Sequence, residues 1–304
     1  MDVGIGLPAL LHDVTPERLL EWARRADAGP FSTISTGELL TTPGYDAVVT
    51  LAATAVVTER VRLMTNVLAV PLHNAGVLAK QLATICRISG GRVVLGAGIG
   101  GKKPVLFGIT GDPAAHSNFP DFDAAPAPYR DRAQRFEGQI ALMRRIWLGE
   151  SAAPGTPPVG PPPVRPGGPE LLVGGFAQAA LERAARLADG VTIFEHGGDT
   201  EKVASYFAVA TEAWARTGRP EPRRVASCHF AVGPRAEDHK ANYLATHYGH
   251  LPPESRAKIG SAIAVGDQRV TTVLREFEAI GADEVVFVPM ASDLEQVDAL
   301  AQLV

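Results

Sequence analysis

The stretch RVRLMTNVLAVPLHNAGVLAKQLATICRISGGRVVLGAGIG, residues 60–100, decides the fold class. Residues 61–70 are rich in Val, Leu and Met and predict a buried strand, and residues 92–100 predict a second one. Between them, Asn74 can cap a helix over residues 75–89, and the glycine pair that follows permits a left-handed stop. Because strand, helix and strand follow one another in this order, the stretch predicts a parallel βαβ unit.

The same alternation continues outward in both directions. Eight short apolar runs are expected to form strands, at residues 2–8, 31–36, 61–70, 92–100, 170–175, 189–194, 223–232 and 283–290. Helical segments separate these runs, with an additional helix near 253–263. The pattern predicts a single α/β domain over residues 1–304, a (β/α)8 TIM barrel, because neither half of the chain could close its own sheet edges. A doubly wound open sheet is the alternative architecture.

Two stretches interrupt the alternation. Residues 101–128 show no clear period and predict a long loop insertion after the fourth strand. A loop at that end of a barrel strand is expected to cover the substrate site. Residues 153–168 are rich in proline and glycine, and we interpret them as a surface loop rather than as a linker between domains.

Composition and charge narrow the possible partners. The chain is 46% hydrophobic and 20% charged, which is typical of a soluble globular protein. Its formal charge of -4 gives no basic surface for nucleic acid, and no apolar run is long enough for a membrane span. Cys86 and Cys228 lie far apart and form no CxxC pair, so we expect two buried thiols in a cytoplasmic protein.

The candidate catalytic residues follow from the geometry of a parallel barrel, in which the loops at the carboxyl ends of the strands gather around one mouth. Glu38 follows the second expected strand, His196 follows the sixth, and His229 lies within the seventh with its side chain toward the interior. A surface-loop position is the alternative for His196. His247 and His250 have helical spacing but no third ligand nearby in sequence, so no metal site is predicted.

Two glycine clusters lie at the same predicted rim. The sequence GAGIGG, residues 96–101, matches the dinucleotide pattern GxGxxG, but no helix is expected directly after it, which argues against a Rossmann site. Glycines there still allow the backbone to approach a flat ligand, with a simple tight turn as the alternative. Gly174 and Gly175 end a strand just before a helix, and the free N–H groups of that helix could hold a phosphate. A short loop that serves packing alone is the other interpretation.

Within residues 60–100, the combination of T-x-V, P-L-x-N, A-K-Q-x-A-T and S-G-G-R-x-x-L-G-x-G resembles the bacterial luciferase-like superfamily of flavin- and F420-dependent oxidoreductases. The opening GIGLP, the VGG turn and the closing EVVFVP strand resemble other recurring features of that superfamily, so the resemblance spans nearly the whole chain. It implies a barrel that binds FMN or the deazaflavin F420 and assembles as a homodimer.

The resemblance also implies positions for the cofactor. It implies a non-proline cis peptide between Asn66 and Val67, in a bulge of the third strand that supports the ring system. It implies that glycines border the cofactor and that a turn holds its phosphate, with these residues: Gly98, Gly100, Gly101, Gly174, Gly175, Phe176 and Ala177. Glu38 would lie beside the ring or the substrate. Many relatives carry an Asp-His pair where this chain has Thr36-Gly37-Glu38, which leaves the proton donor unassigned.

These features predict an oxidoreductase that acts on a small organic substrate, by hydride transfer with F420 or by monooxygenation through a flavin peroxide with FMN. A non-catalytic flavin-binding protein of the same fold is one alternative. An unrelated barrel hydrolase or lyase is another, although the first strand has no HxH metal pair and no lysine falls inside an expected strand.

Overall fold

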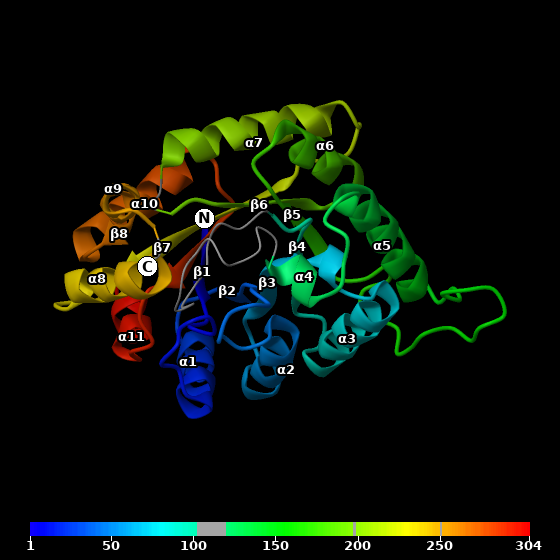
Figure 1. Cartoon of the computed structure of the whole chain (residues 1–304), viewed down its shortest axis with the longest axis horizontal. Coiled ribbons are helices and arrows are strands. Elements are labelled where there is room, and N and C mark those ends of the chain that lie inside the picture. The colour runs from blue at the N-terminus through cyan, green and yellow to red at the C-terminus, as the bar shows by residue number, and fades with distance from the viewer. Residues whose placement is uncertain (102–119, 197–198, 250) are drawn as a thin grey trace.

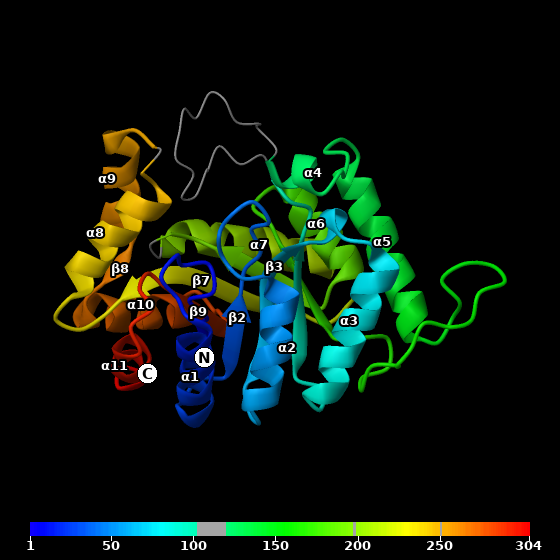
Figure 2. The ribbon, with the colours of Figure 1, turned by 60° about the horizontal axis from the view of Figure 1, so that its bottom comes forward.

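Parallel strands close into a barrel at the centre of the molecule, and helices surround it (Figures 1 and 2). This computed structural model describes residues 1–101, 120–196, 199–249 and 251–304. The barrel strands are β1 (Asp2–Gly6), β2 (Thr33–Thr36), β3 (Arg62–Ala69), β4 (Val93–Gly98), β5 (Glu170–Gly174), β6 (Gly190–Phe194), β7 (Arg223–Ala231) and β9 (Glu284–Pro289). β1 pairs with β2 and β9, and β6 pairs with β5 and β7, so the ring closes.

The helices alternate with the strands and cover the outside of the barrel (Figure 1). They are α1 (Pro16–Ala28), α2 (Ala47–Val57), α3 (Ala75–Ile88), α4 (Pro120–Ala124), α5 (Arg132–Trp147), α6 (Gln178–Leu187), α7 (Thr200–Ala215), α8 (Ala236–His247), α9 (Pro253–Ala262), α10 (Asp267–Ala279) and α11 (Glu295–Ala301). The predicted cap of α3 is confirmed, because the Asn74 side chain accepts a hydrogen bond from the Val77 N–H at 3.1 Å. Among the described residues, no helix combines the length and the apolar character that crossing a bilayer requires.

The predicted barrel is confirmed, and the open-sheet alternative is wrong. The additional helix predicted near 253–263 is α9, and it is followed by β8 (Ala264–Val265), a two-residue strand that pairs with β7 outside the ring. The stretch predicted as a long loop after β4 contains α4, and its segment 102–119 lies outside the described residues. Residues 153–168 form a loop between α5 and β5 that extends away from the barrel (Figure 2). α11 has no counterpart among the expected helices, since its 7 residues are too few for a clear helical period.

Side chains alternate along each strand between the barrel interior and the surrounding helices. The middle layer of the interior consists of buried apolar side chains, namely Met64, Val94, Leu172, Val225 and Val286. Their sequence neighbours, such as Leu63 and Val285, belong to the larger core between the barrel and the helices. Cys86 and Cys228 are buried and unpaired, as predicted.

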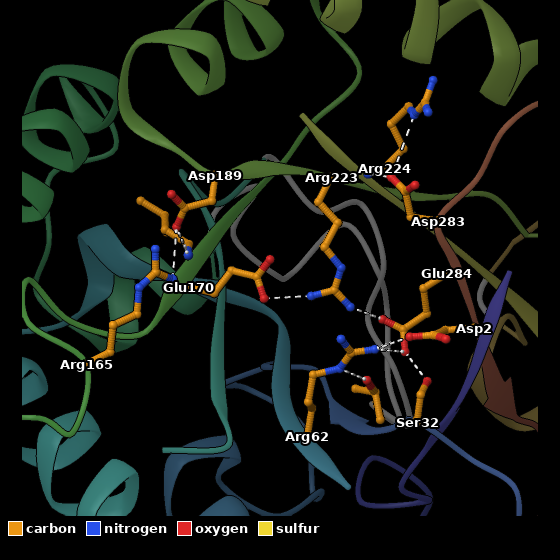
Figure 3. Close-up of polar contacts among 12 residues, drawn as sticks. Asp2, Ser32, Arg62, Arg165, Glu170, Asp189, Arg223, Arg224, Asp283 and Glu284 are labelled. Carbon is orange, nitrogen blue, oxygen red and sulfur yellow. Dashed lines mark hydrogen bonds and ion pairs between the residues drawn. The ribbon is translucent and has the colours of Figure 1, made fainter. Parts of the chain in front are cut away.

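Below this layer, at the amino ends of the strands, a network of charged side chains closes the barrel (Figure 3). The carboxylate of Glu284, which is fully buried, lies 2.6 Å from Arg223 Nη2 and 3.5 Å from Arg62 Nη2. Arg223 Nη1 also lies 2.6 Å from the Glu170 carboxylate, and the Ser32 hydroxyl donates a hydrogen bond to Glu284. We call this network the barrel floor. Because it fills the barrel at the amino ends of the strands, a ligand site is expected at their carboxyl ends.

Candidate functional site

Two adjoining cavities lie at the carboxyl ends of the barrel strands. The glycine cavity has a volume of about 480 Å³ and is lined by the glycines that end β4 and β5. The histidine cavity has a volume of about 500 Å³ and lies between the ends of β1, β7 and β9 and the helices α8 and α9. Both volumes fall in the range of about 300–1,000 Å³ that is usual for sites of small organic ligands. The cavities share four lining residues, Glu38, Asn66, Val67 and Phe194.

The wall between the cavities is built on an irregularity of β3. The peptide bond between Asn66 and Val67 is cis, and the pairing of β3 with β4 shifts register over these two residues, so the expected cis peptide and bulge are confirmed. The Asn66 amide donates to Ser227 Oγ at 2.8 Å and accepts from Thr192 Oγ1 at 2.9 Å. Two strands on the other side of the barrel, β6 and β7, therefore hold the bulge through both ends of this side chain.

Two glycines leave the space that the Val67 side chain occupies. A Cβ atom at Gly98 or at Gly174 would lie 3.0 Å from a methyl carbon of Val67, so any larger residue there would displace the wall. Gly100 and Gly101 also line the glycine cavity, and Gly100 has a positive φ of 70°, which favours glycine. The glycines predicted to border a cofactor thus lie together around one cavity.

The turn from β5 into α6 lies at the edge of the glycine cavity. Gly174, Gly175 and Phe176 line it, whereas Ala177 does not and instead occupies the N-cap position of α6. No side chain caps this helix. The N–H groups of a first helical turn lack partners within the helix and carry partial positive charge, so this turn suits an anionic group such as phosphate.

Glu38 lies where the cavities meet, and both of its carboxylate oxygens are engaged. Oε2 accepts a hydrogen bond from the Ala69 N–H at 2.8 Å, and Oε1 lies 2.6 Å from His73 Nε2. Burial alone would lower the pKa of His73, but the hydrogen bond to Glu38 and its charge outweigh burial and raise it. His73 was not among the predicted site residues, although it occupies the variable position of the P-L-x-N motif. The pair places the Glu38 carboxylate, in hydrogen-bond contact with His73, at the junction.

The histidine cavity contains two hydrogen-bonded pairs of aromatic rings. His229 Nε2 lies 3.2 Å from the Tyr243 hydroxyl, and His196 Nδ1 lies 3.2 Å from the Tyr248 hydroxyl. As expected, His229 points inward from β7, whereas its neighbour Phe230 belongs to the outer core. His196 lies in the loop after β6, is partly buried and lines the same cavity. Tyr243 and Tyr248 could not be found from a motif, because their contact with the rim depends on how α8 folds back over the barrel.

Burial keeps these rings uncharged near neutral pH. Burial, then the neighbouring His196 and His247, lower the pKa of His229 to about 3. Burial also lowers the pKa of His196, despite the nearby charge of Glu195, and raises the pKa of Tyr248 to about 12. The rings can therefore donate and accept hydrogen bonds without offering a counter-charge.

Of the histidine pair with helical spacing, His247 belongs to this arrangement. His247 lines the histidine cavity and stacks on Tyr243 with ring centroids 4.2 Å apart, and burial lowers its pKa to about 4. His250 lies outside the described residues. Within the described part of the chain, no group of three His, Cys, Asp or Glu side chains is arranged to hold a metal ion.

Solved structures resemble this chain over its whole length. Monooxygenase RslO1 from Streptomyces bottropensis has a TM-score of 0.77 and 19% identity, with 100% of this chain and 98% of that one covered. An F420-dependent secondary alcohol dehydrogenase, in complex with an F420-acetone adduct, has a TM-score of 0.73, 15% identity and the same coverage. The FMN complex of the oxygenating constituent of 3,6-diketocamphane monooxygenase from Pseudomonas putida has a TM-score of 0.69 and 17% identity, with 99% and 95% covered. At these identities the likeness establishes the fold.

Curated relatives match a shorter part of the chain, and the activities in their names are properties of those proteins. An uncharacterized protein of Mycobacterium tuberculosis is 29% identical over 189 residues, which span 59% of this chain and 58% of the relative. The F420-dependent glucose-6-phosphate dehydrogenase of Intrasporangium calvum is 30% identical over 131 residues, which span 42% of this chain and 31% of that enzyme. The sequence model of the luciferase-like monooxygenase family matches residues 2–285, nearly the whole chain. The chain belongs to the luciferase-like monooxygenase family.

Proposed function

We propose that the chain is an oxidoreductase that binds F420 or FMN in the glycine cavity and a small organic substrate in the histidine cavity. The observation that carries the proposal is the wall common to both cavities, formed by Glu38, Asn66, Val67 and Phe194. Ligands in the two cavities would meet at these side chains. Redox chemistry requires such a direct approach of the cofactor to the substrate.

The glycine cavity fits a flat ring that carries an anionic tail. Gly98 and Gly100 leave the backbone open to close approach, and the first turn of α6 offers N–H groups to a phosphate, which both FMN and F420 carry. When bound, F420 exchanges a hydride with the substrate, and FMN activates oxygen for monooxygenation. F420 is our first candidate, because two curated relatives, from Intrasporangium calvum and Beutenbergia cavernae, bear F420-dependent names.

The three predicted catalytic side chains take different parts in this proposal. Glu38 fixes a charge at the junction, and His229 is tied to Tyr243 and positions the neighbouring rings. If F420 were bound and the substrate were an alcohol, F420 would take up the hydride from the carbon, and a residue of this chain would have to accept the proton that the hydroxyl oxygen releases. His196 is our candidate for that base, since it is neutral and no described group hydrogen-bonds its Nε2.

Separate titrations with F420 and FMN test the proposal, followed by absorbance and fluorescence. We expect saturable binding of F420, and we expect G98V to weaken it at least tenfold because the new side chain displaces Val67. G138A serves as the control, since a Cβ at Gly138 on α5 meets no described atom within 4 Å. Tight binding of FMN alone would favour monooxygenation over hydride transfer, and binding of neither cofactor would refute the proposal.

His196→Asn is expected to reduce kcat about 100-fold, because a positioned general base typically contributes at least that much. Wild-type activity is expected to fall in acid through a pKa below 6.5, since burial lowers the pKa of His196 and only its neutral form accepts a proton. Steady-state kinetics over a range of pH check both points, and the cofactor affinity of H196N is expected to equal that of the wild type. H239N is the matched control, because His239 lies 3.8 Å from Asp293 and lines neither cavity. An unchanged pH profile in H196N would refute the assignment.

A further inference from the structure

Among the residues that the structure describes, the lining of the histidine cavity offers no cation to an anionic substrate. Apolar side chains dominate it, among them Leu10, Leu39, Leu251 and Ile259. None of its described lining residues is lysine or arginine, and Glu38 contributes a carboxylate. A phosphate or carboxylate in this cavity would lose its hydration next to the Glu38 carboxylate, which carries a like charge. The free energy lost with the hydration is far larger than the free energy gained from contacts with apolar side chains.

A cationic substrate is disfavoured for a different reason. The Glu38 carboxylate already accepts hydrogen bonds from the Ala69 N–H and from His73, and its charge raises the pKa of His73. Both Glu38 oxygens therefore already have a hydrogen-bond partner, and a cation would have to compete with these partners for the carboxylate. What remains for the cavity is an uncharged ligand.

The polar groups that such a ligand would meet are uncharged rings with defined orientation. Tyr248 holds His196 through Nδ1 at 3.2 Å, and the His196 ring also stacks on His229 with centroids 5.8 Å apart and an interplanar angle of 28°. These contacts fix the ring while no described group hydrogen-bonds its Nε2. A neutral imidazole nitrogen can donate to a carbonyl oxygen or accept from a hydroxyl, depending on its tautomer.

We infer that the histidine cavity takes an uncharged, largely apolar molecule with one hydroxyl or carbonyl oxygen, which His196 hydrogen-bonds while Tyr248 holds the imidazole ring. The inference deepens the proposed function, on which it rests. It also separates this chain from the curated relatives named as glucose-6-phosphate dehydrogenases, whose named substrate carries a phosphate.

Calorimetric titration with probes of matched size tests the inference. The probes are 4-phenylbutan-2-one and 4-phenylbutanoate, which differ chiefly in charge, with glucose 6-phosphate as a third. At pH 7.5 the ketone is expected to bind at least 30-fold more tightly than either anion. The inference is overturned if an anion binds as tightly as the ketone, or if the ketone does not bind at millimolar concentration.

Two substitutions assign the binding to this cavity. Y248F is expected to weaken binding of the ketone about fivefold to tenfold, because the His196 ring loses its hydrogen bond. L251K introduces an ammonium group into the lining and is expected to strengthen binding of the carboxylate about tenfold and weaken that of the ketone. The control L148K introduces the same charge at an exposed side chain that lines neither cavity and leaves both affinities unchanged. Ketone binding that neither Y248F nor L251K alters would overturn the inference.

Cofactor titration of the same samples separates the two proposals, because Tyr248 and Leu251 do not line the glycine cavity. If the ketone binds selectively but neither F420 nor FMN binds, the proposed function fails and the description of the cavity stands. If a cofactor binds and the carboxylate matches the ketone, the proposed function stands and the inference about the substrate fails.

Discussion

Replacing Glu284 by glutamine is expected to lower the free energy of unfolding by about 3–5 kcal/mol. This carboxylate is fully buried in the barrel floor and balances two guanidinium groups, those of Arg223 and Arg62. Removing its charge takes a buried counter-charge from both guanidinium groups and leaves them with Glu170 and Asp2 as partners, and breaking a buried pair from one side costs more than the pair itself contributes. Equilibrium unfolding in urea, followed by far-UV circular dichroism, measures the effect.

The exposed acid Glu278 provides the control for this experiment. Its side chain is 68% exposed and lies 3.7 Å from the terminal amino group, so E278Q is expected to change stability by no more than about 0.5 kcal/mol. Cofactor affinity of refolded E284Q is expected to equal that of the wild type, since the floor lies at the opposite end of the barrel from the cavities. A urea midpoint for E284Q no lower than that for E278Q would contradict the role of the floor.

The second large effect is a loss of stability in mild acid. The folded protein holds His229 and His247 neutral, because burial lowers their pKa values to about 3 and about 4 from an ordinary value of 6.5. The unfolded chain takes up these protons once the pH falls below 6.5, so the stabilisation is complete above that pH and is lost as the pH falls toward the folded values. At pH 5 each histidine is expected to reduce the free energy of unfolding by about 2 kcal/mol, and the two together by about 4.

Single substitutions distinguish these histidines from the carboxylates that also titrate in acid. H247Q and H229Q are each expected to flatten the decline between pH 7 and pH 5 by about 2 kcal/mol. The measurement is the free energy of unfolding in urea at a series of pH values. If both variants lose stability between pH 7 and pH 5 as steeply as the wild type, the two buried histidines are not the cause.

Much of the barrel could be predicted because each strand carries its own local signal. Apolar runs, caps such as Asn74 and glycine stops occur within a few residues of the elements that they define. The predicted ends of the elements differ from the observed ends by up to three residues. Strand ends are hard to predict because they depend on pairing with strands that are distant in sequence. β2, for example, begins at Thr33 rather than at residue 31, because it starts where it pairs with Arg62 of β3.

The site could be predicted in part for the same reason. Glycines and the Asn66-Val67 bulge belong to compact motifs, so their positions around one cavity were accessible from the sequence. The partners of the histidines were not, because His229 meets Tyr243 only after α8 packs over the rim. The floor was also missed, since Glu170 and Glu284 each begin an apolar strand and look alone like ordinary boundary charges.

The side chains that fill the barrel interior are distinct from those that line the two cavities. The floor and the middle layer, which contribute to holding the ring together, include no residue that lines either cavity. The apolar residues of α9 and of the segment before it, such as Ile259 and Leu251, line only the histidine cavity. Leu251 and Ile259 pack on the small cluster around Ala231 and Tyr243 and not on the barrel interior, so selection in the laboratory or in nature can vary them to accept new molecules while the ring of strands stays intact.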